Sequence, residues 1–185
     1  EENLTSGWYY SHPVTDAELR LMIDSLLFSK DIPYSQCKEL INKLKGLSSR
    51  YFDVKVDYIR NLPEDGIDNK QLFYTIDIID EAIRKHRQVS FHYSEYKTDK
   101  KLHDRMDAEG KVRNYIINPY QIAATNGRYY LICNNDKYDN LSYYRLERIR
   151  DIYITEDRQK PYKTLKGCEH GLDLPKHMAE HIYMM

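Results

Sequence analysis

The chain has 185 residues, of which 41% are apolar and 31% are charged, and this composition suits a soluble globular protein. The length allows one medium-sized domain, or a small domain with a substantial appendage. The sequence contains no apolar run of the roughly 18 residues that a membrane-spanning helix needs, and no signal-peptide pattern. The three cysteines are isolated and odd in number, which disfavours a disulfide framework and favours a reducing cytoplasm.

Charge is unevenly distributed along the chain. The formal net charge is −1, which by itself argues against a strong nucleic-acid binder. Residues 111–163, however, contain ten lysines and arginines against six acidic residues, together with nine of the eighteen tyrosines. Positive charge and aromatic rings therefore coincide in one segment, although the signal is weaker than that of a true basic patch.

The first part of the chain predicts two helices. Thr15-Asp-Ala-Glu18 has the spacing of a capping box, and apolar residues at helical spacing continue to about Lys30. Pro33 suits the first position of a second helix, which Gly46 is suited to end. Because the connection is short, the two helices are expected to pack as an antiparallel pair. We expect residues 1–68 to form a helical linker or dimerisation region.

An irregular segment follows, with a β-like run at Phe52–Ile59 and a turn at Pro63-Glu-Asp-Gly66. Asp68 is then placed to cap a third helix. Apolar residues recur on one face of this helix from Leu72 to Ile83, and cations gather near its end, where they suit the helix dipole.

From Gln88 onward the apolar period changes from helical to alternating, and residues 97–110 read as a charged loop. The Asn126-Gly127 pair suits a two-residue type I′ turn and predicts a β-hairpin. The fold class expected is α+β, with a small antiparallel barrel and its leading helix over residues 69–160, and with residues 161–185 leading to a C-terminal extension. The predicted strands lie at Val89–Tyr93, Tyr115–Ile117, Ile122–Ala124, Arg128–Cys133, Leu141–Leu146 and Ile149–Thr155.

An ordered set of short motifs resembles the WYL domain family. The motifs are Asn118-Pro-Tyr120, Gly127, Tyr129-Tyr-Leu131 and Tyr144-Arg-Leu-Glu-Arg-Ile149. The family pattern has a proline before one strand, a glycine turn, Trp-Tyr-Leu, and a later run similar to Arg-Leu-Asp-Arg-Ile. In this chain a tyrosine stands where tryptophan is usual, and a glutamate where aspartate is usual. The resemblance covers roughly residues 76–158, and the helices before it resemble the linker of WYL regulators.

This resemblance implies an Sm-like or SH3-like barrel in a cytoplasmic bacterial transcription regulator. The resemblance implies that the regulator has an N-terminal winged helix-turn-helix and forms a dimer. It also implies that the domain senses a ligand, for which single-stranded DNA or a nucleotide is the favoured candidate. Because the two predicted helices at the start are not basic, we expect the DNA-binding domain to lie outside this sequence. We also expect the natural protein to extend beyond both ends.

Strand alternation separates candidate ligand contacts from core residues. It assigns Tyr129, Leu131, Tyr144 and Leu146 to the core and leaves Tyr130 and Arg145 facing outward. Tyr130 is then either packed or a ligand contact. Arg148 follows a turn, where its guanidinium is suited either to clamp a phosphate bidentately or to pair with a neighbouring carboxylate, Glu147 or Asp151. The remaining candidate ligand-binding residues, each with a structural alternative, are His92, Tyr93, Arg113 and Tyr120.

A rival motif, His177-Met-Ala-Glu-His181, fits the H-x-x-E-H pattern of inverted zinc peptidases. On a helix its two imidazoles share one face, and Glu180 is a candidate base. A third ligand has to come from upstream, and a pattern this short arises easily by chance. We therefore expect no enzymatic activity, catalytic residue, cofactor or metal site. A dimerisation module without a ligand is the main alternative to a sensor, and a zinc-dependent enzyme is a remote one.

Overall fold

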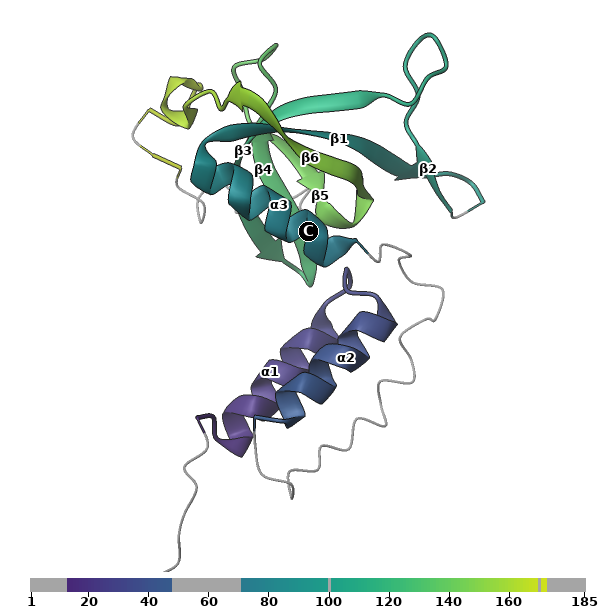
Figure 1. Ribbon diagram of the computed structural model, residues 1–185, viewed down its shortest axis with the longest axis vertical. Coiled ribbons are helices and arrows are strands. Elements are labelled where there is room, and N and C mark those ends of the chain that lie inside the picture. The colour runs from purple at the N-terminus through teal and green to yellow at the C-terminus, as the bar shows by residue number, and fades with distance from the viewer. Residues whose placement is uncertain (1–12, 48–70, 100, 170, 173–185) are drawn as a thin grey trace, which may run out of the picture. The chain divides into compact units, whose positions relative to one another are not determined.

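A computed structural model describes residues 13–47, 71–99, 101–169 and 171–172 (Figure 1). The chain divides into two compact units, Glu1–Gly66 and Ile67–Met185. The predicted β-like run at 52–59, the turn at 63–66, the Asp68 cap and the His177–His181 motif all fall outside the described residues. Among the helices that are described, none has the length and apolar character to cross a membrane.

The first unit contains two helices that lie side by side (Figure 1), α1 (Asp16–Phe28) and α2 (Tyr34–Lys45). The predicted capping box is confirmed: the Glu18 N–H donates to Thr15 Oγ1 over 3.3 Å, and the Thr15 N–H donates to Glu18 Oε2 over 2.8 Å. These hydrogen bonds to Thr15 lower the pKa of the Glu18 carboxyl. The buried residues between the helices are Leu19, Ile23, Cys37 and Ile41.

In the second unit, α3 (Leu72–Lys85) lies across the sheet (Figure 1) and contacts β1, β3 and β6. Leu72 and Ile79 are buried on this helix, as the helical spacing predicts, and Ala82 is buried with them. The helix ends at His86, whose φ of 52° is left-handed. The very next residue begins the first strand.

The sheet has six antiparallel strands in the order β2-β1-β3-β4-β5, and β6 also pairs with β1. The hairpin between β3 and β4 is confirmed, since Thr125 pairs with Arg128 around Asn126 and Gly127, whose φ angles are 50° and 75°. The short strand β2 lies within the segment that the sequence predicts as a charged loop. The strands are β1 (Arg87–Tyr96), β2 (Leu102–Asp104), β3 (Asn114–Thr125), β4 (Arg128–Asn134), β5 (Ser142–Arg145) and β6 (Ile149–Arg158).

The α+β class is confirmed, but closure of the sheet into a barrel is not. Over the described strands, β5 pairs with β4 and β6 pairs with β1, and no pairing joins β5 to β6. A 3₁₀ helix, η2 (Leu146–Arg148), separates these two strands and turns the chain between them. The sheet is therefore open at this place.

Strand alternation is only partly right about the core. Leu131 and Leu146 are fully buried, as predicted. Tyr130 was predicted to face outward, but only 5% of it is exposed, whereas Tyr129 is half-buried. The reason is that every residue of β4 from Tyr130 to Asn134 is buried, so both faces of the strand are covered and alternation no longer separates inside from outside.

Candidate functional site

Four aromatic rings from three strands form a packed cluster at the centre of the site. Phe91 and Tyr93 come from β1, Tyr115 from β3 and Tyr144 from β5. Phe91 and Tyr115 stack with centroids 5.8 Å apart. Tyr144 meets the other three rings edge-on at 4.9 to 5.6 Å. Offset and edge-on pairs of this kind add stabilisation beyond the area they bury. We call these four packed rings the aromatic floor.

Two phenols of this floor, those of Tyr93 and Tyr144, stay neutral. Burial raises the pKa of both Tyr93 and Tyr144 above the ordinary tyrosine value. The Tyr93 oxygen accepts a hydrogen bond from the backbone N–H of Arg145 over 3.1 Å. The floor is thereby tied to the strand end that carries two arginines.

Four arginines surround this floor. The Arg113 guanidinium lies 4.8 Å from the ring centroid of Tyr115, and that of Arg105 lies 5.5 Å from the ring centroid of Tyr93. Arg148 lies 5.3 Å from the ring centroid of Tyr96 at the end of β1. Such distances are those of cation–π contacts. We call the group formed by Arg105, Arg113, Arg145, Arg148 and Tyr96 the arginine–tyrosine surface.

Backbone hydrogen bonds explain why the connection between β2 and β3 places two of these arginines here. The N–H of Arg105 donates to the Tyr93 carbonyl over 3.1 Å, which continues the pairing of β2 with β1 by one residue. The N–H of Arg113 then donates to the Arg105 carbonyl over 2.7 Å. A loop of seven intervening residues thus returns to the same edge of β1 and delivers both side chains to the floor.

Two carboxylates pair with members of this group. Arg105 Nε donates to Glu95 Oε2 over 2.9 Å. Glu147 is fully buried, forms an ion pair with Arg145, and lies with its Oε1 atom 3.6 Å from Arg148 Nε. The four guanidinium groups thus carry more positive charge than these two carboxylates carry negative charge.

The surface remains open to solvent. The side chains of Arg145 and Arg148 are 20% and 23% exposed, Arg113 is exposed, and 42% of Tyr96 is exposed. Partly covered guanidinium groups next to an accessible ring are suited to an anion that also carries an aromatic face, because the local screening by water is reduced.

The structure gathers some of the sequence-predicted residues and separates others. Tyr93, Arg113, Arg145 and Arg148 meet at this surface. Tyr130 lies opposite Arg145 in the register of β4 and β5, but it is buried. Their roles as ligand contacts stay predictions.

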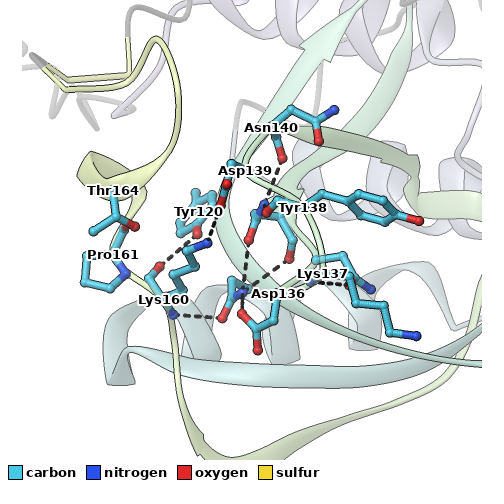
Figure 2. A network of polar contacts seen from close by, with 12 residues as sticks. Tyr120, Asp136, Lys137, Tyr138, Asp139, Asn140, Lys160, Pro161 and Thr164 are labelled. Atoms are coloured by element: carbon cyan, nitrogen blue, oxygen red, sulfur yellow. Dashed lines mark hydrogen bonds and ion pairs between the residues drawn. The ribbon is translucent and has the colours of Figure 1, made fainter.

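His92 and Tyr120 lie apart from this group. His92 Nδ1 is 3.2 Å from Asp151 Oδ2, and alternation along β1 directs it away from Tyr93. Tyr120 belongs to another network (Figure 2): its hydroxyl donates to the Lys160 carbonyl over 2.8 Å, and the Lys160 ammonium donates to Asp139 over 3.0 Å. Burial raises the Tyr120 pKa, so this hydroxyl stays a donor.

The Tyr120 network fastens the segment after β6 to the sheet. The Lys160 N–H donates to Asn118 Oδ1, and Asn118 Nδ2 donates to Asp136 Oδ1, over 2.8 and 2.7 Å. Gln88 also donates to both Asn118 and Asp136. Since these groups satisfy one another, the network reads as a structural anchor.

Sequence reasoning missed Arg105, Tyr96 and the buried state of Glu147. Arg105 lies in the predicted charged loop, where a basic residue carries no signal of its own. The sequence offers no alternation that would mark the short strand, since Leu102 is its one apolar residue and all three of its residues are half-buried. That strand places the next residue beside β1.

Metal and thiol chemistry have no site among the residues that the structure describes. No group of three or more histidine, cysteine or acidic side chains is placed to hold a metal ion in that part of the chain. Cys37, Cys133 and Cys168 are free and buried, and burial raises the pKa of each thiol. Thiols in such surroundings are poor nucleophiles.

Comparison with known proteins gives one family. Residues 74–154 match the family model described as "WYL domain". Among solved structures, the chain is similar to proteasome accessory factor B/C (PafBC) of Arthrobacter aurescens, with 15% sequence identity and a TM-score of 0.38, over 86% of this chain and 23% of that chain. No curated protein matches the sequence. The matched segment covers the aromatic floor and all four arginines of the surface, and this part of the chain is therefore similar to a WYL domain.

Proposed function

We propose that this chain is the ligand-sensing part of a cytoplasmic bacterial transcription regulator. Its ligand is an anion of the nucleic-acid type, a short single strand or a nucleotide, which binds at the arginine–tyrosine surface. The observation that carries this proposal is that four arginines from separate places in the sequence lie at one packed aromatic floor. The guanidinium groups of Arg105 and Arg113 lie over two of its rings, the backbone N–H of Arg145 donates to Tyr93, and Arg148 lies over the ring of Tyr96 on the same strand as Tyr93. The match of residues 74–154 to the WYL domain model supports a regulatory rather than a catalytic role.

The chemistry of the surface fits such a ligand in two ways. Guanidinium groups pair with phosphate oxygens through two parallel hydrogen bonds, which gives both affinity and orientation. The accessible ring of Tyr96 offers a face on which a base stacks without sequence preference. Tyr93 and Tyr130 are almost fully buried, so in this proposal they support the arginines rather than contact the ligand.

Regulation requires that the ligand binds one arrangement of the protein more tightly than another. In this proposal the chain acts on a DNA-binding domain outside the sequence described here, and two copies form a dimer. Ligand binding changes the relative populations of two dimer arrangements, and the affinity for DNA changes with them.

The proposal is tested by fluorescence polarisation with a labelled single strand of about eight nucleotides, a length within the range of one small binding module. Arg113→Ala is the informative variant because Arg113 is exposed and its removal leaves the core intact. We expect binding to weaken by about tenfold, as for one charged hydrogen bond. The slope of log Kd against log salt concentration should fall by about 1.

Arg84→Ala provides the matched control, since Arg84 is also exposed but lies in the last turn of α3. This variant should bind as the wild type does. If the double variant Arg113→Ala, Arg148→Ala keeps the wild-type affinity and salt dependence, the proposed site is wrong.

A dimerisation module without a ligand is the second candidate, and α1 favours it. Leu21 and Phe28 are 68% and 64% exposed and lie seven residues apart, on one face of that helix. In this case, Leu21→Ser with Phe28→Ser should dissociate a dimer in sedimentation velocity at low concentration. Oligonucleotides should then leave the melting temperature of the wild type unchanged.

A further inference from the structure

We infer that Glu147 is a positioning residue, which holds the guanidinium groups of Arg145 and Arg148 in the arrangement that receives the anion. This inference rests on the proposed function and identifies how two of its phosphate-binding groups are oriented. Glu147 lies between the two arginines in the sequence, and its side chain is completely buried.

The geometry of η2 brings the two arginines to one carboxylate oxygen. Arg145 is the residue before this 3₁₀ helix and Arg148 is its last residue, so they are three positions apart. A 3₁₀ helix has three residues per turn, which places these two side chains on the same side. Arg145 Nη2 forms an ion pair with Glu147 Oε1, and Arg148 Nε lies 3.6 Å from the same oxygen.

The backbone that carries this arrangement is fixed on both sides. Leu146 and Ile149, which flank it, are fully buried. The backbone N–H of Arg145 is held by the Tyr93 hydroxyl. The carboxylate therefore has little freedom to move, and the arginines that pair with it are ordered before any ligand arrives.

Such ordering matters because a free arginine side chain loses considerable conformational entropy when it is immobilised. A site in which this ordering has already occurred on folding binds its ligand more tightly than one in which the ligand must impose it. Arginine has five N–H donors in a planar fork. The part of each side chain that stays exposed, about one-fifth, is the part that an anion can reach.

Glu147 differs from its two arginine partners in how much of its side chain is exposed. The two arginine side chains are each about one-fifth exposed, whereas Glu147 has no exposed surface. A ligand that approaches from solvent therefore meets the guanidinium groups and not the carboxylate. Arg148 is additionally directed over the Tyr96 ring, which places a phosphate-binding group beside the proposed stacking face.

Two roles for Glu147 predict opposite signs in one experiment. If the carboxylate merely neutralises charge, its loss increases the positive charge of the surface and tightens anion binding. If it positions the arginines, its loss weakens anion binding despite the added positive charge. Glu147→Gln distinguishes the two because it removes the charge and keeps the shape of the side chain.

The test measures the affinity of Glu147→Gln for the labelled single strand by fluorescence polarisation, below the melting temperature of the variant. We expect binding to weaken by about tenfold, and the slope of log Kd against log salt concentration to fall by about 1 to 2, as for the loss of one or two phosphate contacts. The control is Glu156→Gln on β6, where an exposed carboxylate is removed with the same change in net charge. Its affinity should equal or slightly exceed that of the wild type.

Glu147→Asp supplies the conservative variant, because it keeps a buried negative charge next to both arginines. Its affinity should return to within about threefold of the wild type, a difference smaller than one typical hydrogen bond. An affinity of Glu147→Gln equal to or above the wild-type value overturns the inference. So does a salt dependence of this variant that is unchanged from the wild type.

A measurement on the wild-type protein covers the case in which Glu147→Gln does not fold. The Nε–Hε signals of Arg145 and Arg148, assigned by Arg→Lys variants, should show ordered side chains in NMR relaxation without any ligand. The exposed Arg113 should be more mobile. Equal mobility of all three would overturn the inference.

The two ideas fail in different ways. If the wild-type protein does not bind the single strand, the proposed function fails, and the NMR measurement alone decides whether Glu147 orders the arginines. If the wild type binds and Arg113→Ala weakens binding, but Glu147→Gln does not, then only the role of Glu147 is wrong.

Discussion

The hydroxyl of Tyr93 accepts a hydrogen bond from the backbone N–H of Arg145 over 3.1 Å, and so joins β1 directly to the end of β5. These two strands do not pair with each other in the sheet. The Tyr93 hydroxyl is therefore a specific point at which stability and the arginine–tyrosine surface are coupled.

Tyr93→Phe should therefore lower the free energy of unfolding of the second unit by about 1 to 3 kcal/mol, because a buried backbone N–H loses its acceptor. Urea denaturation followed by circular dichroism measures this change. The control is Tyr96→Phe, which removes an exposed hydroxyl and should change stability by less than about 0.5 kcal/mol. Equal effects of the two substitutions would contradict the role of the Tyr93 hydroxyl.

Stability should also fall at alkaline pH. Burial raises the pKa of Tyr93, Tyr120 and Tyr144 in the folded state. Above about pH 10, the ordinary tyrosine pKa, the unfolded chain releases these protons while the folded chain retains them. The stabilising contribution is thus complete below that pH and is lost as the pH rises toward the folded-state values.

Melting temperatures measured between about pH 8 and pH 11, on both sides of the ordinary tyrosine pKa, test this dependence. Tyr144→Phe should make the decline shallower, since one of the three groups no longer titrates. A melting temperature that stays constant through this range would show that the phenols ionise as readily in the folded protein as in the unfolded chain.

Tyr120→Phe should destabilise the protein without affecting ligand binding. Its hydroxyl donates to the Lys160 carbonyl in the network of Figure 2, away from the arginine–tyrosine surface. We expect a loss of about 1 kcal/mol in the free energy of unfolding, the usual value for one hydrogen bond. The affinity for the labelled single strand should not change, and a clear loss of affinity would make Tyr120 a ligand contact after all.

In the first unit, Thr15→Ala should destabilise α1 by about 1 kcal/mol, because its capping box is lost. Hydrogen exchange of the amides in the first turn of α1 is the most direct measurement. Ser25→Ala serves as the control: its hydroxyl bonds back to the Leu21 carbonyl within the helix, and alanine has the higher helix propensity. Faster exchange in the first turn is thus expected only for Thr15→Ala.

Local features of this protein were predictable because the responsible residues are close in sequence. The capping box of Thr15 and Glu18 and the turn at Asn126-Gly127 each depend on a few neighbouring residues, and both are confirmed. The buried state of Tyr130 was not predictable, because it depends on what covers the second face of β4.

The site was predictable only in part for the same physical reason. The motif that contains Arg145 and Arg148 is continuous, so sequence reasoning selected both residues. Arg105 reaches the surface through the pairing of β2 with β1, which is a contact between segments rather than a property of either one. Whether Glu147 is buried also depends on packing around η2, which no local pattern reveals.

The joint at His86 has a mechanical consequence. A single residue in the left-handed conformation, His86, separates α3 from β1. This conformation is uncommon for residues other than glycine, and histidine is among those that adopt it more often. Because the connection is one residue long, a rotation of α3 about its axis must twist the start of β1. Phe91 and Tyr93 stand on that same strand. A rotation of α3 and a ligand bound at the arginines would therefore both act on β1, one at each end of that strand.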